Sequence, residues 1–404
     1  MTNFDDSTES FDCQSDGFES VLVDELGKIF DSLPENRLEA KLGLDRWVGR
    51  SGYPITVMVR AYLASYLLNI GNTNSLIRRL QEDVALREIC GFPNLKPLPN
   101  RRTFNRIMDR LGLHYDLIEW CIDQVLYKLR EVLPNFGTII AIDGTDVHTH
   151  SDCGRKPVSD KEAGFVIKEG ATGHSKKWTW GYKLHLIADA TYELPIAMSL
   201  TPGNVREMTE MIPLLRATKE RLSWINPRYI IADRGYDDHK NFEAIVKEFG
   251  AEPIIKSRME VPVFGTPAQP FCMGKLPLVY RSWDKNKGVQ YQCPERAKKA
   301  TCPLPEKCPV KIIWVRPVHD YRRFGHHIAK HTEEWTNLYS RRTAIERVNS
   351  RLKYHRRLDS HCFRGIERIR LHCTLAILSL LGGALAKAQL YGADQVRVCV
   401  RALN

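Results

Sequence analysis

The segment FGTIIAIDG, residues 136–144, gives the clearest indication of the fold. An apolar run over residues 139–142 leads directly into Asp143, as in a strand buried on both faces of a sheet. The segment RYIIADRG, residues 228–235, repeats the pattern and leads into Asp233. One strand-end Asp often only begins a turn, but two on adjacent strands can converge where open α/β sheets bind ligands.

The residues around these two strands complete an α/β pattern. A β-hairpin is predicted over residues 181–203, an amphipathic helix over about 206–222, a second helix over 239–249, and a third strand over 252–256. The order strand, hairpin, helix, strand, helix, strand matches the central unit of a ribonuclease H-like fold. We therefore expect a mixed sheet with helices on both faces, and a β-rich insertion at about residues 257–330.

A polar stripe is predicted on the helix that follows, at about residues 333–357. In YSRRTAIERVNSRLK, residues 339–353, the side chains of Tyr339, Arg342, Glu346 and Lys353 fall within an arc of roughly 60° on a helix. Such a stripe suits an anionic ligand, whereas most charged helix faces are solvated and held by internal ion pairs. The arginines of this helix outnumber the acidic residues available to pair with them.

At these residues the sequence resembles the cut-and-paste DDE transposases of bacterial insertion sequences, the group with a Tyr-Arg-Glu-Lys signature. The signature positions are Tyr339, Arg342, Glu346 and Lys353, and the segments DGT at 143–145, TPGNVRE at 201–207 and ADRGYD at 232–237 are also similar. The resemblance covers roughly residues 139–386. Residues 55–111 are similar to the helical N-terminal domain found in the same proteins.

The resemblance implies that Asp143, Asp233 and Glu346 bind two Mg²⁺ ions, for which Mn²⁺ can substitute. It also implies that Tyr339, Arg342 and Lys353 contact DNA phosphates. The reaction would be cleavage at transposon ends and strand transfer into target DNA. Two alternatives stay open at this point: a domesticated DNA-binding protein without catalytic activity, and a two-metal nuclease that cuts without joining.

The chain is predicted to have three parts: an acidic disordered tail at 1–20, a helical region at 21–135, and the catalytic domain at 136–404. The helical region contains a basic helix at 101–112 after a Pro-rich break, which fits a helix-turn-helix reader of DNA or an ordinary helical bundle equally well. Its arginines Arg101, Arg102 and Arg106 either contact DNA or are only solvated. The apolar helix at about 371–386 is expected in a core.

Composition sets the expected partners and location. The formal net charge of +11 favours nucleic acid as the partner. The resemblance implies that this partner is double-stranded DNA and that a homodimer brings two transposon ends together. No signal peptide or membrane span is expected, and the predicted location is the cytoplasm, at the bacterial nucleoid. The 11 cysteines are then thiols or metal ligands.

Two further groups of residues raise the question of a metal. Structural Zn²⁺ in the insertion is an option, because metal binding can stabilise a segment with little apolar surface, although the cysteine intervals exceed those of most zinc sites. The residues concerned are Cys272, Cys293, Cys302, Cys308, His326, His327 and His331. Asp146, His148 and His150 are interpreted as turn residues beside the active site rather than as a separate metal cluster.

Overall fold

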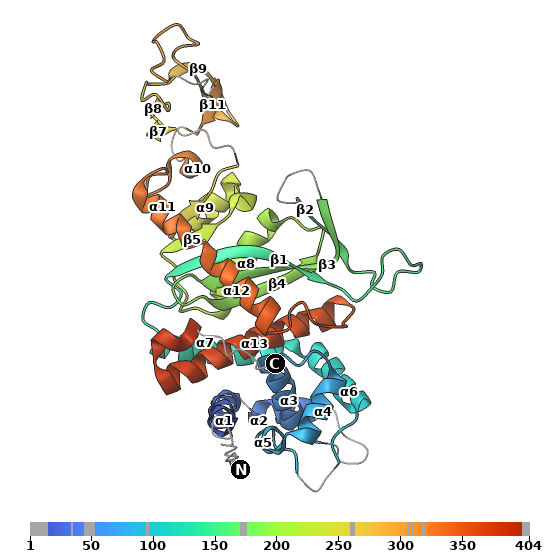
Figure 1. The fold of residues 1–404 in the computed structure, drawn as a ribbon. Coiled ribbons are helices and arrows are strands. Elements are labelled where there is room, and N and C mark those ends of the chain that lie inside the picture. Colours follow the sequence, from blue (N-terminus) through green and yellow to red (C-terminus); the bar gives the residue numbers. More distant parts are fainter. Residues whose placement is uncertain are drawn as a thin grey trace, which may run out of the picture. The chain divides into compact units, whose positions relative to one another are not determined.

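The computed structural model describes residues 15–33, 35–43, 53–93, 97–169, 176–258, 263–304, 308, 311–316 and 320–397. The chain divides into two compact units. One comprises Met1–Pro134, Thr149–Lys161 and Arg351–Asn404, and the other comprises Asn135–His148 and Glu162–Ser350. The second unit contains the predicted mixed sheet (Figure 1).

The sheet has the strand order β2-β3-β1-β5-β6, and β4 pairs with β3. The strands are β1 (Ile139–His148), β2 (Gly164–Glu169), β3 (Lys176–Asp189), β4 (Leu194–Pro202), β5 (Tyr229–Ala232) and β6 (Glu252–Ile255). β1 is antiparallel to β3 and parallel to β5, and β5 is parallel to β6. The sequence order matches the prediction because α8 (Glu207–Arg221) joins β4 to β5, and α9 (His239–Lys247) joins β5 to β6.

One boundary in the sheet differs from the prediction. Asp143 does not end its strand, because β1 continues to His148 opposite β3, with Asp146 paired to Lys183. The interpretation of Asp146 and His148 as turn residues was therefore wrong. Pairing with β5 stops earlier, at Ile142 opposite Ala232. Beyond that point β3 is the paired neighbour of β1 among the described residues, and it holds the polar residues after Asp143 in the strand.

The first unit is helical. Its helices are α1 (Ser15–Asp31), α2 (Glu35–Gly43), α3 (Ile55–Leu67), α4 (Thr73–Glu82), α5 (Val84–Ile89), α6 (Arg101–Leu113), α7 (Tyr115–Val132), α13 (Ile366–Tyr391) and the 3₁₀ helix η2 (Ala393–Arg397). Residues 1–14 of the predicted tail lie outside the described residues, and α1 begins at Ser15, before the predicted boundary at 20.

The C-terminal helix α13 packs within this helical unit, against α7, α1, α3 and α6. It is long and apolar enough to cross a membrane, but 94% of its most apolar window is buried inside the structure, which confirms its prediction as a core helix. Gly382 permits the close packing of α1, because a Cβ there would lie 3.0 Å from Ile29 Cγ2. Residues 351–404 thus group with the helical unit, whereas the predicted boundary assigned them to the catalytic domain.

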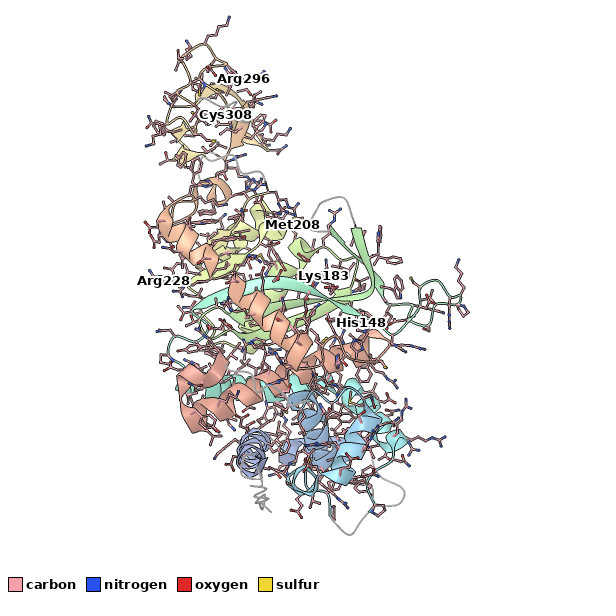
Figure 2. All side chains as sticks on the ribbon, viewed as in Figure 1. His148, Lys183, Met208, Arg228, Arg296 and Cys308 are labelled. Atoms are coloured by element: carbon pink, nitrogen blue, oxygen red, sulfur yellow. The ribbon has the colours of Figure 1, made fainter. Side chains whose placement is uncertain are left out.

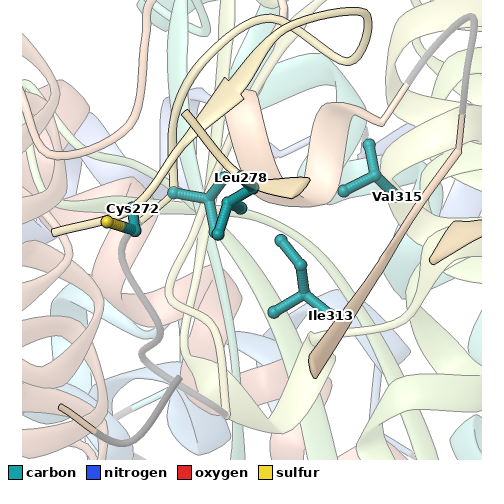
Figure 3. Packing of buried hydrophobic residues seen from close by; sticks show 5 residues of the cluster. Cys272, Leu278, Ile313 and Val315 are labelled. Carbon is teal, nitrogen blue, oxygen red and sulfur yellow. The ribbon is translucent and has the colours of Figure 1, made fainter. Parts of the chain in front are cut away.

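The insertion has a small apolar core of its own, shown in Figure 3. Its elements are β7 (Phe264–Gly265), β8 (Pro270–Phe271), β9 (Val279–Asp284), β10 (Gly288–Gln292), β11 (Ile312–Val315) and α10 (Tyr321–Phe324). Cys272 is buried with Val263, Leu278, Ile313 and Val315 in that core. Arg322 of α10 ties the insertion to the loop after β5 by two hydrogen bonds of 2.7 Å to the carboxylate of Asp237.

The structure does not support the predicted zinc site. Three cysteines of the insertion, Cys272, Cys293 and Cys302, form no disulfide within the described residues. Within the described residues, no three His, Cys, Asp or Glu side chains form a group that could hold a metal ion. The prediction assumed that this Pro-rich segment buries little apolar surface, and the core around Cys272 supplies that surface instead.

Candidate active site

Asp143 and Asp233 lie side by side because of the strand register. Ile142 of β1 is level with Ala232 of β5 in the parallel pair, so the next residue on each strand is an aspartate. Asp233 then caps the short 3₁₀ helix η1 (Arg234–Tyr236), where its Oδ1 accepts a hydrogen bond of 2.6 Å from the Gly235 amide. The convergence of the two aspartates that the sequence predicts is therefore present.

Asp143 is held in an environment that opposes its charge. Burial is the largest effect, and the charges of Asp233 and then Glu207 add to it, so that the pKa of Asp143 rises to about 7. The Gly144 amide and Arg342 act in the opposite direction but do not cancel the rise. Clustered carboxylates with a raised pKa are typical of functional sites and of sites that bind cations.

Glu346 lies on α12 (Thr343–His355), between two residues that interact with Asp143. Asn349, three residues further on, donates a long hydrogen bond of 3.5 Å to Asp143 Oδ2, and Arg342 lowers the pKa of Asp143. The carboxylate of Glu346 accepts a hydrogen bond of 2.7 Å from Arg342 and is half-exposed. Spacings of three and four residues place these side chains on one face of the helix.

The predicted single helix carrying the polar stripe is in fact two helices. α11 (Glu333–Ser340) carries Tyr339, and α12 begins at Thr343. Between them the amides of Arg341 and Arg342 bond to carbonyls three residues back, which tightens the backbone into a 3₁₀-like turn. The narrow arc of side chains calculated for residues 339–353 as one continuous α-helix therefore does not include Tyr339.

Tyr339 nevertheless remains next to the site. Its ring stacks on Trp335 with centroids 5.2 Å apart, and the Arg342 guanidinium lies 5.9 Å from its centre. Burial and, after it, the charge of Asp233 raise the pKa of Tyr339, while Arg342 lowers it. Lys353, near the end of α12, lies 3.6 Å from Asp359. The structure therefore brings Tyr339 and Arg342 close to the aspartates and leaves Lys353 further along the helix.

Four residues at the site were not identified from the sequence: Lys183, Glu207, Tyr236 and Asn349. Asn349 is spaced three residues from Glu346, Glu207 ends the segment TPGNVRE and Tyr236 lies in ADRGYD, but no role was assigned to any of the three. Glu207 begins α8, where an acidic residue is unremarkable because it complements the helix dipole. Lys183 and Tyr236 are recognisable only once the pairing of β1 with β3 and the turn at η1 are known.

Comparison with known proteins places this geometry in a family. The model of the transposase DDE domain family matches residues 134–381, more than half of the chain. The chain belongs to the DDE transposase family. A second family model, a transposase domain of the DUF772 type, matches residues 12–110.

Two individual proteins are similar to this DDE transposase family member. The protein assigned as the transposase of insertion sequence element IS402 in Burkholderia cepacia is 35% identical over 83 residues, which cover 19% of this chain and 38% of that protein. The match therefore spans well under half of the relative. A solved structure, the piggyBac transposase synaptic complex with hairpin DNA, aligns over 91% of this chain and 74% of its own, with a TM-score of 0.39 and 12% identity.

The donor set at the site fits hard divalent cations, which prefer oxygen ligands. Asp143, Asp233 and Glu346 offer carboxylate oxygens. Two other polar atoms near them, Asn349 Oδ1 and the Tyr236 hydroxyl, are buried and have no hydrogen-bond partner in the described structure. As they stand, the described carboxylates do not form a group of three within reach of one ion.

Proposed function

We propose that this chain is a DNA transposase that cleaves DNA at transposon ends and joins them to target DNA. The observation that carries the proposal is the position of Asp143 and Asp233 at the ends of a parallel strand pair, beside the face of α12 that bears Glu346. The proposal includes helices on both faces of the sheet, with α12 on one and α8 and α9 on the other (Figure 1).

Asp143, Asp233 and Glu346 would hold two Mg²⁺ ions, or Mn²⁺ in their place. Such ions, when bound, activate an attacking oxygen and stabilise the leaving 3′-oxygen of an in-line displacement at phosphorus. Burial and the charges of Asp233 and Glu207 raise the pKa of Asp143, and bound cations would compensate the negative charge gathered there. Asn349 would position Asp143 through its hydrogen bond to Oδ2.

The basic residues next to these carboxylates would bind DNA. Arg342, with about a quarter of its side chain exposed, can present its guanidinium to a phosphate near the scissile bond, and Tyr339 supports that guanidinium. Lys353 would contact a phosphate further along the backbone. In the helical unit, α6 exposes Arg101, Arg102 and Arg106 on the face opposite its buried residues, which suits a DNA contact.

Two alternatives remain in a different class: a DNA-binding protein without catalysis and a nuclease without joining activity. Incubation of the purified chain with Mg²⁺ and labelled DNA carrying the inverted repeats that flank its coding region separates them. The transposase should produce free 3′-hydroxyl ends and joined products. Ends without joined products would favour the nuclease, and binding without either product would favour the DNA-binding protein. A homodimer is proposed because joining requires two ends held together.

A further inference from the structure

Glu207 lies between the backbone segments that follow Asp143 and Asp233, where two glycines leave room for its side chain. A Cβ at Gly144 would lie 2.9 Å from Glu207 Oε1, and a Cβ at Gly235 would lie 3.2 Å from Oε2. Gly144 directly follows Asp143, and Gly235 lies two residues after Asp233. The absence of a side chain at both glycines therefore allows the Glu207 carboxylate to reach the backbone beside each aspartate.

Lys183 provides a positive charge for this carboxylate. Its Nζ lies 3.2 Å from Glu207 Oε1 and donates to the Val205 carbonyl, also at 3.2 Å. The side chain, labelled in Figure 2, belongs to β3 and is 14% exposed. A single ammonium cannot balance Glu207 together with Asp143 and Asp233, and Arg342 is already paired to Glu346. The cluster therefore carries net negative charge.

Tyr236 provides a separate indication that a ligand belongs here. Its side chain is fully buried, and within the described structure its hydroxyl has no hydrogen-bond partner. Burial and the charges of Glu207, Asp143, Asp233 and Glu210, in that order, raise its pKa well above the usual range, so the negative charge of those carboxylates acts on this hydroxyl. A buried hydroxyl without a partner is costly, and a water molecule bound to a cation would satisfy it.

We infer that Glu207 is a fourth carboxylate ligand of the divalent cation site formed with Asp143 and Asp233, and that Lys183 is displaced from Glu207 when the cation binds. The inference rests on the proposed function, because it assumes a cation between the two aspartates. A role limited to an ion pair with Lys183 would account for Glu207 Oε1, but not for the approach of Oε2 to the same point beside Gly235 as Asp233 Oδ1. It would also leave the Tyr236 hydroxyl without a partner.

Titration of the full chain with Mn²⁺, followed by the electron paramagnetic resonance signal of the free ion, tests the inference without DNA or turnover. Glu207→Gln keeps the size of the side chain and should weaken Mn²⁺ binding by at least about tenfold. The matched control is Glu210→Gln, one turn along α8, which removes the same charge from a residue that acts weakly on Tyr236 and does not affect Asp143. Its binding should change by less than about threefold.

Lys183 supplies a second test, because its ammonium group would compete with the cation for the Glu207 carboxylate. Lys183→Met should strengthen Mn²⁺ binding severalfold in the otherwise unchanged chain, and should have little effect in the Glu207→Gln background, where no carboxylate is left for Lys183 to block. Thermal unfolding of each variant shows that it is folded at the temperature of the titration. Equal strengthening by Lys183→Met in both backgrounds would mean that Lys183 acts only as a nearby charge and would overturn its assigned role.

The remaining outcomes separate this inference from the proposed function. If Asp143→Asn loses Mn²⁺ binding while Glu207→Gln binds as the unchanged chain does, Glu207 is not a ligand and the aspartate site stands. If Glu207→Gln and Glu210→Gln weaken binding equally, the effect is general charge and the inference is overturned. If Asp143→Asn binds Mn²⁺ unchanged, the cation site itself is wrong, and the proposed function falls with this inference.

Discussion

Asn349 Nδ2 lies 3.5 Å from Asp143 Oδ2, so a residue of α12 contacts a residue of β1 that is 206 positions earlier in the chain. Asn349 is 8% exposed, and its own Oδ1 has no partner in the described structure. The contact fixes one carboxylate oxygen of Asp143 relative to the helix that carries Glu346. It also makes Asn349 a positioning residue that can be tested separately from the carboxylates.

Asn349→Ala should lower the rate of DNA-end cleavage by roughly 10–100-fold, as expected when a residue that orients a metal ligand is removed. The affinity for end DNA should stay the same, because Asn349 is buried. Single-turnover cleavage and a binding assay on the same DNA measure the two effects. Ser350→Ala, at an exposed neighbouring position, is the control and should cleave normally. A cleavage rate unchanged by Asn349→Ala would remove its positioning role.

Lys353→Ala should weaken DNA binding and make the salt dependence shallower. One lost phosphate contact reduces the slope of log K against log salt by about one unit. The ion pair of Lys353 with Asp359 at 3.6 Å would exchange for that phosphate. Lys247→Ala, which removes an exposed lysine paired to Glu243 on α9, is the control and should leave the slope unchanged. The same slope for Lys353→Ala and the unaltered chain would exclude the phosphate contact.

His185 should make the protein less stable in acid. Burial lowers the pKa of His185 to about 4, below its ordinary value of 6.5, and the charge of the neighbouring Lys183 adds to this effect. The unfolded chain then binds a proton before the folded chain does, so stability is lost as pH falls from about 6.5 to about 4. The loss attributable to this one group is up to about 3 kcal/mol.

Thermal unfolding at pH 7 and pH 4.5 measures this loss. His185→Gln retains a group able to bond to Thr201 Oγ1, which lies 2.9 Å from His185 Nε2, and it cannot titrate. The variant should therefore lose less stability between the two pH values than the unaltered chain. An identical loss in both proteins would show that protonation of other groups accounts for the acid sensitivity.

Arg357 should be needed for the stability of the helical unit. It is buried and donates to Ser65 Oγ at 2.8 Å and to the Gly71 carbonyl at 2.9 Å, with its guanidinium over the Tyr66 ring. Arg357→Met leaves buried acceptors without donors and should cost about 1–3 kcal/mol of unfolding free energy. Arg341→Met, at an exposed position, should change stability by less than about 0.5 kcal/mol. Chemical denaturation compares the two, and equal effects would contradict the structural role of residues 351–404 in this unit.

The sequence predicted the order of helices and strands along the chain around Asp143 and Asp233, because apolar runs that lead into an aspartate are a local feature of the chain. It missed the continuation of β1 to His148, because polar residues there form a strand only through pairing with β3. It also missed the break between α11 and α12, because Arg341 and Arg342 are strong helix formers. Both features depend on contacts between distant segments.

The candidate site, like the fold, could be predicted only in part from the sequence. Asp143, Asp233 and the residues of α12 follow from motif and spacing. Glu207 does not, because its importance comes from the space left by Gly144 and Gly235 on two other segments. The apolar core around Cys272 was not predicted for the same kind of reason, since it joins residues from both ends of the insertion.

The central claim is that Asp143, Asp233 and Glu346 act together as the cation-binding carboxylates of DNA cleavage. The most direct measurement compares end cleavage and end binding for Asp143→Asn, Asp233→Asn and Glu346→Gln. Each variant should lose cleavage by at least about 10³-fold while binding the same DNA within about threefold of the unaltered chain. If the Glu346→Gln variant cleaves DNA ends at a rate comparable to that of the unaltered chain, the account is contradicted.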